Sequence, residues 1–406
     1  MTATIDPRLL LDPDVVADPY PFYRRLQKEA PVWRVPDTDI VVVSSYELVA
    51  EATGRIEDFS SRLTALLYAD ADGLPCRLPF GADASETLAT ADPPAHTVHR
   101  AAVFPELVAK RMADLEPEIV EVTAACIDDA LEAGAVDFMA AIGNVVPITV
   151  VSQLIGFRDS DLDQLLDTAF ASTALLGARI SLDDLSALVD RVALTTAWVD
   201  EQLDTAAEQP GDDILGTVAR AEAAAAFGRA EADIMVMTLL SAGGESTTSL
   251  LGNAVRLLAE QPELQARLRT EPELLPVFVE EALRLESPFR FLFRSAARDA
   301  TLGGVDIPAG ASMLLMWGAA NRDPGEFERP DEVDLQRQVP RRHLAFGRGI
   351  HHCVGAPLAR LEARVVLGDL LARTEAIELD PAESPTWADS LQVRRHARLP
   401  VRLTPR

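Results

Sequence analysis

The chain has 406 residues and is acidic, with 64 Asp and Glu against 37 Lys and Arg and a formal net charge of −27. Repulsion from phosphate at this charge excludes nucleic acid as a partner. Three cysteines are too few for a disulfide framework and are typical of a reducing compartment. No window approaches about eighteen consecutive apolar residues, and the first residues lack a basic stretch followed by an apolar run. We therefore expect an unprocessed cytoplasmic protein with no membrane segment.

The first ninety residues combine short regular elements with one long irregular segment. The pattern predicts a helix over Pro21–Glu29 and extended segments at Val32–Trp33 and Ile40–Val43, the latter because of its β-branched run. Residues Ser61–Ala91 mix Gly, Pro, Asp and Ser with scattered apolar residues. We expect a long irregular loop here, and such loops inside a compact domain are usually functional.

The sequence Asp-Pro-Pro at residues 92–94 marks the start of a helix. His96 and Arg100 follow four residues apart and lie on one face of that helix. Two donors on one face can hold an anionic group. Without other evidence, the same spacing more often belongs to an ordinary solvated face.

From about Pro105 to Glu260 the pattern predicts one helix after another. The breaks are expected at Gly134, near Asp159, near Gly177 and at Gln209-Pro210-Gly211.

The longest of these helices, over about Ala230–Glu260, contains the sequence Ser-Ala-Gly-Gly-Glu-Ser-Thr-Thr at residues 241–248. Each mid-helix glycine costs about 1 kcal/mol relative to alanine, so the adjacent pair Gly243-Gly244 requires a structural reason. The Ser246 hydroxyl can bond back to the carbonyl of Ala242 and open the helix locally. A Ser/Thr-rich segment of a core helix is the alternative interpretation.

The predicted helix Pro276–Leu285 carries Glu281 and Arg284 at i,i+3 spacing, which is normally a weak surface ion pair. Residues 289–293 follow as Phe-Arg-Phe-Leu-Phe. If they are extended, Arg290, Leu292 and Arg294 share one face and the phenylalanines face the core. A solvated or structurally paired Arg290 is the alternative that remains open.

Short strands are expected near Ala300–Val305 and Ser312–Trp317, with a turn at Ile307–Gly310 between them. Because helices predominate, the fold class is mainly α with a minor β portion. No Gly/Ser-rich or Pro-rich linker interrupts residues 1–406, which favours a single large domain.

The most informative segment is Phe-Gly-Arg-Gly-Ile-His-His-Cys-Val-Gly at residues 346–355. It places Cys353 directly before a predicted helix over Ala356–Thr374. A helix N-terminus favours the thiolate through its dipole and its free N–H groups. Gly347, Gly349 and Gly355 allow tight turns and a close approach to a large planar ligand. A buried cysteine in a capping loop is the alternative interpretation.

This loop resembles the haem-binding loop of the cytochrome P450 family. The Asp-Pro-Pro helix, the 241–248 segment and the Glu-x-x-Arg pair are similar to three further motifs of that family. The resemblance implies the P450 fold, haem b as cofactor and Cys353 as the iron ligand. It also implies haem contacts from His96, Arg100, Ala242, Gly243, Arg294, Phe346, Gly347, His351, Cys353 and Gly355.

The family's Glu-x-x-Arg pair is buried, and an arginine before the haem loop completes it. Arg337 is the candidate here, with a structural role alongside Glu281 and Arg284. The 241–248 segment is similar to the family's oxygen-binding motif, which assigns Glu245, Ser246 and Thr247 to catalysis. This chain departs from that motif at Ser246, where threonine is usual. Serine keeps the hydroxyl but loses the methyl group that restricts its rotamer.

The implied function is a monooxygenase that inserts one oxygen atom from O2 into a C–H bond or C=C of a small to medium hydrophobic substrate. Electrons would come from a ferredoxin or flavodoxin and its reductase. The surroundings of Cys353 are locally basic, with Arg341, Arg342, His343, Arg348, His351, His352, Arg360 and Arg364. The exposed members of this set would form a positive patch that receives the partner. The alternatives are a peroxide-driven peroxygenase and a non-enzymatic haem-thiolate sensor or carrier. The predicted substrate pocket comprises Met237, Leu240, Ser241, Arg290 and Leu292.

Overall fold

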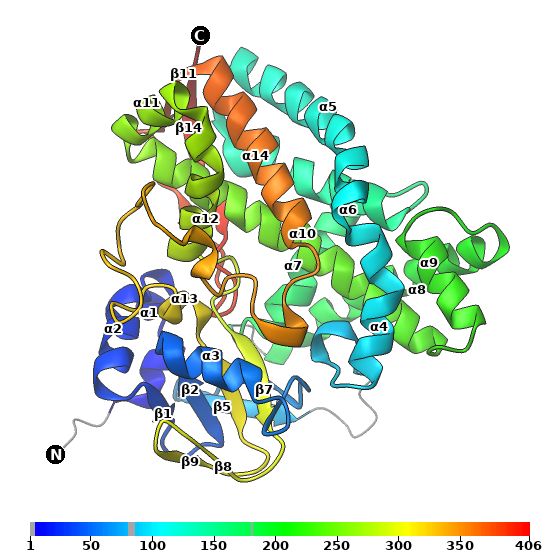
Figure 1. Ribbon diagram of the computed structural model, residues 1–406, viewed down its shortest axis with the longest axis vertical. Helices are drawn as coiled ribbons and strands as arrows, with labels where there is room; N and C mark the ends of the chain where they lie inside the picture. Colours follow the sequence, from blue (N-terminus) through cyan, green and yellow to red (C-terminus); the bar gives the residue numbers. More distant parts are fainter. Residues whose placement is uncertain (1–4, 80–85, 180–181) are drawn as a thin grey trace.

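The computed structural model describes residues 5–79, 86–179 and 182–406. Most helices pack into one large body, while the longest sheet lies at one side of it beside the N-terminal segments (Figure 1). The α-helices are α1 Pro13–Ala17, α2 Tyr20–Glu29, α3 Tyr46–Gly54, α4 Ala95–Val103, α5 Ala109–Ala133, α6 Val145–Ile155, α7 Leu162–Leu176, α8 Leu182–Glu208, α9 Ile214–Ala223, α10 Arg229–Ala259, α11 Pro262–Thr270, α12 Leu275–Leu285, α13 Trp317–Ala320 and α14 Ala356–Arg373. The strands are β1 Val32–Arg34, β2 Ile40–Val43, β3 Phe59–Ser60, β4 Ala65–Ala69, β5 Pro75–Pro79, β6 Ala135–Asp137, β7 Leu292–Ala296, β8 Ala300–Leu302, β9 Val305–Ile307, β10 Ser312–Leu315, β11 Thr374–Leu379, β12 Thr386–Trp387, β13 His396–Arg398 and β14 Pro400–Pro405.

The largest sheet has the strand order β1-β2-β10-β7-β3. Its β2 strand is apolar throughout because both faces of the sheet are covered. Ile40 and Val42 pack into one hydrophobic cluster, which also contains Phe291 and Phe293. Val41 and Val43 pack into another cluster on the opposite face. The sheet is thereby fixed between two cores, and β7, which lies between β10 and β3, holds Arg294 opposite Met313 of β10.

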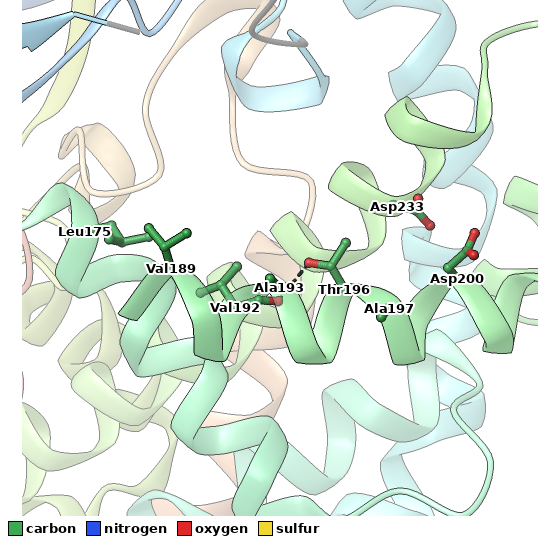
Figure 2. A pocket seen from close by; sticks show the side chains of 8 residues that line it. All are labelled: Leu175, Val189, Val192, Ala193, Thr196, Ala197, Asp200 and Asp233. Carbon is green, nitrogen blue, oxygen red and sulfur yellow. Dashed lines mark hydrogen bonds between the residues drawn. The ribbon is translucent and has the colours of Figure 1, made fainter. Parts of the chain in front are cut away.

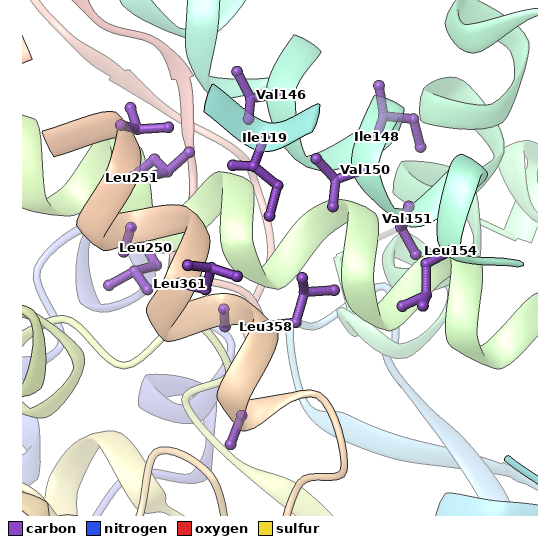
Figure 3. Close-up of a cluster of buried hydrophobic side chains, with 14 of the residues drawn as sticks. Ile119, Val146, Ile148, Val150, Val151, Leu154, Leu250, Leu251, Leu358 and Leu361 are labelled. Carbon is purple, nitrogen blue, oxygen red and sulfur yellow. The ribbon is translucent and has the colours of Figure 1, made fainter. Parts of the chain in front are cut away.

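The helical body is built around α10, whose residues are buried along most of its length. Figure 3 shows part of this core, where α10 meets α6 and α14. Leu250 of α10, Leu361 of α14 and Val150 of α6 belong to the same cluster. This packing fixes α10, which carries Ser246, relative to α14, which begins directly after the Cys353 loop.

The structure confirms the mainly helical fold class with a minor β portion, and the four predicted breaks lie between helices. Two local predictions were wrong. The supposedly irregular 61–91 segment contains the hairpin β4–β5, although residues 80–85 lie outside the described part. The predicted strand at 300–305 is also a hairpin, β8–β9, because the chain reverses at Gly303-Gly304, both of which have positive φ.

The C-terminal strands β11 to β14 were not anticipated by the sequence analysis. β14 pairs with β11 and also with β6, which lies far away in the sequence. Among the described helices, none has the length and apolar character required to cross a bilayer.

Candidate active site

Cys353 lies in a loop shaped by two turns of positive φ, at Gly347 and Gly349. A side chain on Gly347 would lie 3.2 Å from the Trp317 ring, so this glycine also permits close packing. The Cys353 N–H donates to the Phe346 carbonyl at 2.8 Å, which closes the loop. The Cys353 side chain is exposed rather than packed into the core.

The thiol of Cys353 receives hydrogen bonds from the backbone N–H groups of Gly355 and Ala356, at the start of α14. The surrounding protein raises the pKa of the thiol by desolvation, whereas these N–H groups and the nearby cations Arg100 and Arg360 lower it. A bound metal cation would add a large further stabilisation of the thiolate. The loop thus presents an accessible sulfur with donors already directed at it.

Four basic side chains from three separate segments gather beside this loop. The His96 and His351 rings lie 4.2 Å apart, and Arg294 and Arg100 both act electrostatically on His351. Burial, followed by these neighbouring cations, lowers the pKa of His351 to about 3. Burial also lowers the pKa of Arg294 to about 10.

This basic cluster has little negative charge to balance it. Arg294 is 4% exposed, yet among the described residues its guanidinium donates only to the Phe293 carbonyl. Arg100 makes neither an ion pair nor a hydrogen bond with any described residue, and His351 Nε2 is buried without a partner. The nearby Asp92 carboxylate is engaged by Ser60 and Ser61. Unpaired buried cations are costly, so the donor set fits an anionic group such as the two propionates of haem.

The loop is supported by an ion-pair triad at Glu281, in which Glu281 and Arg284 are fully buried and Arg337 is partly buried. Arg284 donates to both carboxylate oxygens at 2.8 and 2.9 Å, and Arg337 donates to the same oxygens at 2.8 and 3.2 Å. Burial alone would raise the pKa of Glu281, but these hydrogen bonds hold it below its usual value. Arg284 also donates to the carbonyls of Asn321, Pro330 and Glu332, so it ties α12 to the segment before the loop. The predicted contact with Arg337 is therefore present.

A second carboxylate cluster, which sequence reasoning missed, lies one residue away at Glu280. It accepts hydrogen bonds from Arg360 of α14 at 2.6 and 3.0 Å and contacts His343 Nε2 at 2.9 Å. Together these bonds hold the pKa of Glu280 down at about 2, against the opposing effect of burial. The adjacent glutamates Glu280 and Glu281 are visible in the sequence. The partners of Glu280, however, lie 63 and 80 residues away, so no local pattern predicts them.

On the other side of the site, one stripe of α10 is only partly buried. Thr238, Leu239, Ala242 and Ser246 lie on it, while most of the helix around them is buried. The Ser246 hydroxyl donates to the Ala242 carbonyl at 2.6 Å, as expected, and α10 remains a continuous helix.

Glu245 points away from this stripe and is 2% exposed. The Thr173 hydroxyl of α7 donates to its Oε2 atom, and Arg395 donates to its Oε1 atom at 2.9 Å. Burial raises the pKa of Glu245 to about 7, although Arg395 opposes the increase. Neither Thr173 nor Arg395 was predicted, since both partners come from distant segments.

The adjacent glycines of α10 have a packing function. A methyl group on Gly243 would lie 2.7 Å from Val151 Cγ2 of α6, and one on Gly244 would lie 3.1 Å from Ile148 Cδ1. Both glycines therefore allow close contact between α10 and α6. The predicted haem contact of Gly243 stays a prediction.

Three residues predicted for the substrate pocket are buried side chains of α10. Leu240 is fully buried in the helical core, and Met237 belongs to the same cluster. Ser241 is 8% exposed and donates to the Met237 carbonyl. Because an enclosed pocket is itself lined by buried side chains, these assignments stay predictions. Leu292 packs at the margin of the second sheet cluster.

Arg290 does not direct its guanidinium into a pocket. It is 3% exposed and donates to the backbone carbonyls of Val16, Ser390 and Val393. The structurally paired alternative is therefore correct for this residue. Phe291 and Phe293 do face the core, as the extended pattern predicted.

Comparisons with known proteins agree with this geometry. The cytochrome P450 family model matches residues 198–391. The chain is 42% identical over 403 residues to cytochrome P450 144 of Mycobacterium tuberculosis, covering 98% of this chain and 92% of that protein. It is 31% identical over 398 residues to a β-dihydromenaquinone-9 omega-hydroxylase of Mycobacterium bovis, covering 97% of this chain and 78% of that protein. The crystal structure of CYP109E1 from Bacillus megaterium in complex with testosterone matches with a TM-score of 0.86 at 27% identity, covering 96% and 99% of the two chains. With a relative of this identity over nearly its full length, the chain belongs to the cytochrome P450 family of haem-dependent monooxygenases.

Proposed function

We propose that residues 1–406 act as one catalytic domain that binds haem b through Cys353 and hydroxylates or epoxidises a small to medium hydrophobic substrate with O2. The observation that carries the proposal is the accessible Cys353 sulfur at the start of α14, beside a cluster of unpaired basic residues. His96, Arg100, Arg294 and His351 would hold the propionates. Gly347, Phe346 and Gly355 shape the loop around the sulfur.

The bound haem, with thiolate ligation, would supply the chemistry that activates oxygen toward unactivated C–H bonds. The chain's own residues would supply orientation and protons. Cys353 would be held as thiolate by the N–H groups of Gly355 and Ala356 and by the positive end of α14. Glu280 and Glu281 would keep the loop in place through Arg360 and Arg337.

Proton delivery is assigned to Glu245 and Ser246, with Thr247 buried beside them. The pKa of Glu245, near 7, suits a group that gives and regains a proton at neutral pH. Its present partners, Thr173 and Arg395, occupy both carboxylate oxygens. Glu245 must therefore change partners to pass a proton toward Ser246, and the Ser246 hydroxyl must leave the Ala242 carbonyl.

We further propose that a ferredoxin or flavodoxin, reduced by its own reductase, supplies the electrons. Arg341, Arg342, Arg348 and Arg364 are exposed near the Cys353 loop. Arg341 lies 3.5 Å from Glu280, Arg342 contacts Glu326 and Arg364 pairs with Glu116. Arg348 forms no ion pair with the described residues. In a chain of charge −27, this local positive surface suits an acidic partner.

The test is the carbon monoxide spectrum of the reduced protein, followed by turnover with electron donors or with peroxide. The parent should give the thiolate-type spectrum and consume O2 with electron donors. Cys353→Ser should lose that spectrum, while Cys76→Ser should keep it. Loss of the spectrum in Cys76→Ser alone would overturn the ligand assignment. Turnover with peroxide but never with electron donors would favour a peroxygenase, and no turnover at all would favour a sensor or carrier.

A further inference from the structure

The Cys353 sulfur has a cation beside it on the first turns of α14. Arg360 lies four residues after Ala356, whose N–H group is directed at that sulfur. Residues four apart share one face of an α-helix, and the rise between them is about 6 Å. Helical side chains also lean toward the N-terminus of their helix. The Arg360 side chain is therefore directed back toward the Cys353 loop.

Two contacts hold the guanidinium of Arg360. Its Nε and Nη2 atoms donate to the two carboxylate oxygens of Glu280, at 2.6 and 3.0 Å. Its central carbon lies 4.5 Å from the centroid of the Phe346 ring, a distance typical of a cation–π contact. Phe346 belongs to the Cys353 loop, because its carbonyl accepts the Cys353 N–H. The cation is thereby joined to the loop that carries the sulfur.

Glu280, the anchor of this cation, is itself fixed from another segment. It is 3% exposed, and its Oε2 atom lies 2.9 Å from His343 Nε2, just before the Cys353 loop. Arg341 approaches its other oxygen at 3.5 Å from the surface. A carboxylate that binds a guanidinium through both oxygens also fixes the orientation of that group. Glu280 therefore holds the Arg360 charge in one place.

The position of this charge matters because Arg360 acts electrostatically on Cys353. Burial raises the pKa of the Cys353 thiol, whereas Arg100 and Arg360 are the side chains that lower it. Arg100 is assigned to a haem propionate, which would neutralise its charge. The Glu280 carboxylate offsets part of the Arg360 charge, and the remainder favours negative charge on the sulfur.

We propose that the charge of Arg360, held in place by Glu280, raises the reduction potential of the iron bound by Cys353. One electron from the electron carrier converts ferric to ferrous iron, and no bond or proton is exchanged. The added electron makes the iron and its sulfur ligand more negative, and a nearby cation stabilises that state. This inference rests on the proposed function, because it concerns reduction of the haem in that site.

The test is a spectroscopic redox titration of the haem-containing protein. Arg360→Gln removes the charge and should shift the equilibrium about tenfold toward ferric iron, which is a 59 mV lower potential for a one-electron couple. Arg360→Lys keeps the charge and should recover at least half of that shift. Both variants lose the paired hydrogen bonds to Glu280, so a purely structural role would affect their potentials alike.

Arg364→Gln is the matched control. Arg364 lies on the same face of α14, about 6 Å farther along the axis, and pairs with the exposed Glu116 at 2.7 Å. Its removal should shift the equilibrium by less than about twofold. Equal potentials in Arg360→Gln and Arg364→Gln, or in Arg360→Gln and Arg360→Lys, would overturn the proposal.

A second control changes the net charge at a different place. Asp200 lines a groove between α8 and the start of α10 (Figure 2) and does not contact the Glu280 cluster. Asp200→Asn should leave the potential within about twofold of the parent equilibrium. A shift as large as that of Arg360→Gln would show that total charge, rather than the place of Arg360, sets the potential.

Glu280→Asp decides the question if Arg360→Gln does not retain haem. It keeps both charges but shortens the anchor by one methylene, which draws the guanidinium away from Phe346. The potential should fall, by less than in Arg360→Gln. An unchanged potential would overturn the proposal, because the position of the charge would then have no effect.

The carbon monoxide spectrum separates failure of this inference from failure of the proposed function. A parent with the thiolate-type spectrum, and with the same potential as Arg360→Gln, would overturn the inference and leave the monooxygenase. A parent that binds haem without that spectrum would overturn the proposed function itself, whatever the potentials.

Discussion

The two sides of the active site differ in how their buried carboxylates are held. Behind Cys353, Glu280 and Glu281 are each bonded to two or more basic residues, which hold their pKa values below the usual range, and α14 is packed into the helical core. On the α10 side, Glu245 has one basic partner, Arg395, and burial raises the pKa of Glu245 to about 7, while partly exposed residues line a stripe of the helix. The first side is built to hold a group still. The second combines a carboxyl group that can exchange a proton near neutral pH with the accessible surface that binding requires.

The largest expected effect lies on the Cys353 side. Glu281→Ala should lower the free energy of unfolding by about 3–5 kcal/mol, because it leaves Arg284 buried without its carboxylate. Chemical denaturation of the mutant and the parent measures this difference.

Glu332→Gln is the control, since the Glu332 carboxylate is exposed and lies 3.9 Å from Arg329. It should cost less than about 0.5 kcal/mol. Equal losses in the two mutants would show that the triad does not stabilise the Cys353 side.

The next effect concerns coupling on the α10 side. Ser246→Ala removes the hydroxyl proposed for proton delivery and should reduce product formed per electron roughly a hundredfold, with peroxide formed instead. Ser246→Thr should preserve or improve the yield. Measurement of product and peroxide against electrons consumed tests both.

Ser249→Ala is matched to Ser246→Ala because the Ser249 hydroxyl makes a similar bond to the Glu245 carbonyl at 2.9 Å but is fully buried. It should leave the yield near that of the parent. If both alanine mutants lose yield equally, a helix distortion rather than proton delivery explains the result.

A smaller effect is expected in pH dependence. Glu245 donates only when protonated, so product per electron should fall as pH rises through about 7. Arg395 lowers the pKa of Glu245, and its removal in Arg395→Gln should therefore move this fall to higher pH. Arg398→Gln, which alters an exposed pair with Asp137, should leave the profile in place. A shift to lower pH in Arg395→Gln would contradict the assignment of Glu245.

The smallest effect concerns the exposed surface near Cys353. Reversing Arg348 and Arg364 to Glu should slow haem reduction by an acidic ferredoxin or flavodoxin severalfold, without altering substrate binding, because neither side chain contacts Glu280 or Glu281. Raising the ionic strength should slow the parent similarly, because charge steering is screened within about 10 Å at 0.1 M salt. Stopped-flow reduction at two salt concentrations measures both effects. Rates that respond to neither change would place the docking face elsewhere.

The contrast between the two sides also explains what the sequence could predict. The Cys353 loop is local, and ten consecutive residues define its turns, its sulfur and the start of α14. Glu281 and Arg284 are three residues apart, so their contact was also predictable. The haem-binding role of the Cys353 loop and the structural role of Glu281 and Arg284 remain proposals.

The α10 side depends on contacts between distant segments. Glu245 meets Thr173 and Arg395 across 72 and 150 residues, and no local pattern specifies either pairing. The prediction that Arg290 faces the pocket was wrong for the same reason, since its partners at Val16 and Ser390 lie 274 and 100 residues away. Helical position also mattered, because Leu240 and Ala242 are close in sequence but face different surroundings.

The glycine pair of α10 has a consequence for the position of Ser246. Val151 and Ile148 of α6 lie directly against Gly243 and Gly244, where an added methyl group would come within 2.7 and 3.1 Å of them. The absence of side chains on the two glycines therefore sets how closely α10 approaches α6. A methyl group added at Gly243 would force the two helices apart, and Ser246 would move with α10. The place of a proposed proton donor thus depends on two aliphatic side chains of a neighbouring helix that take no part in proton transfer.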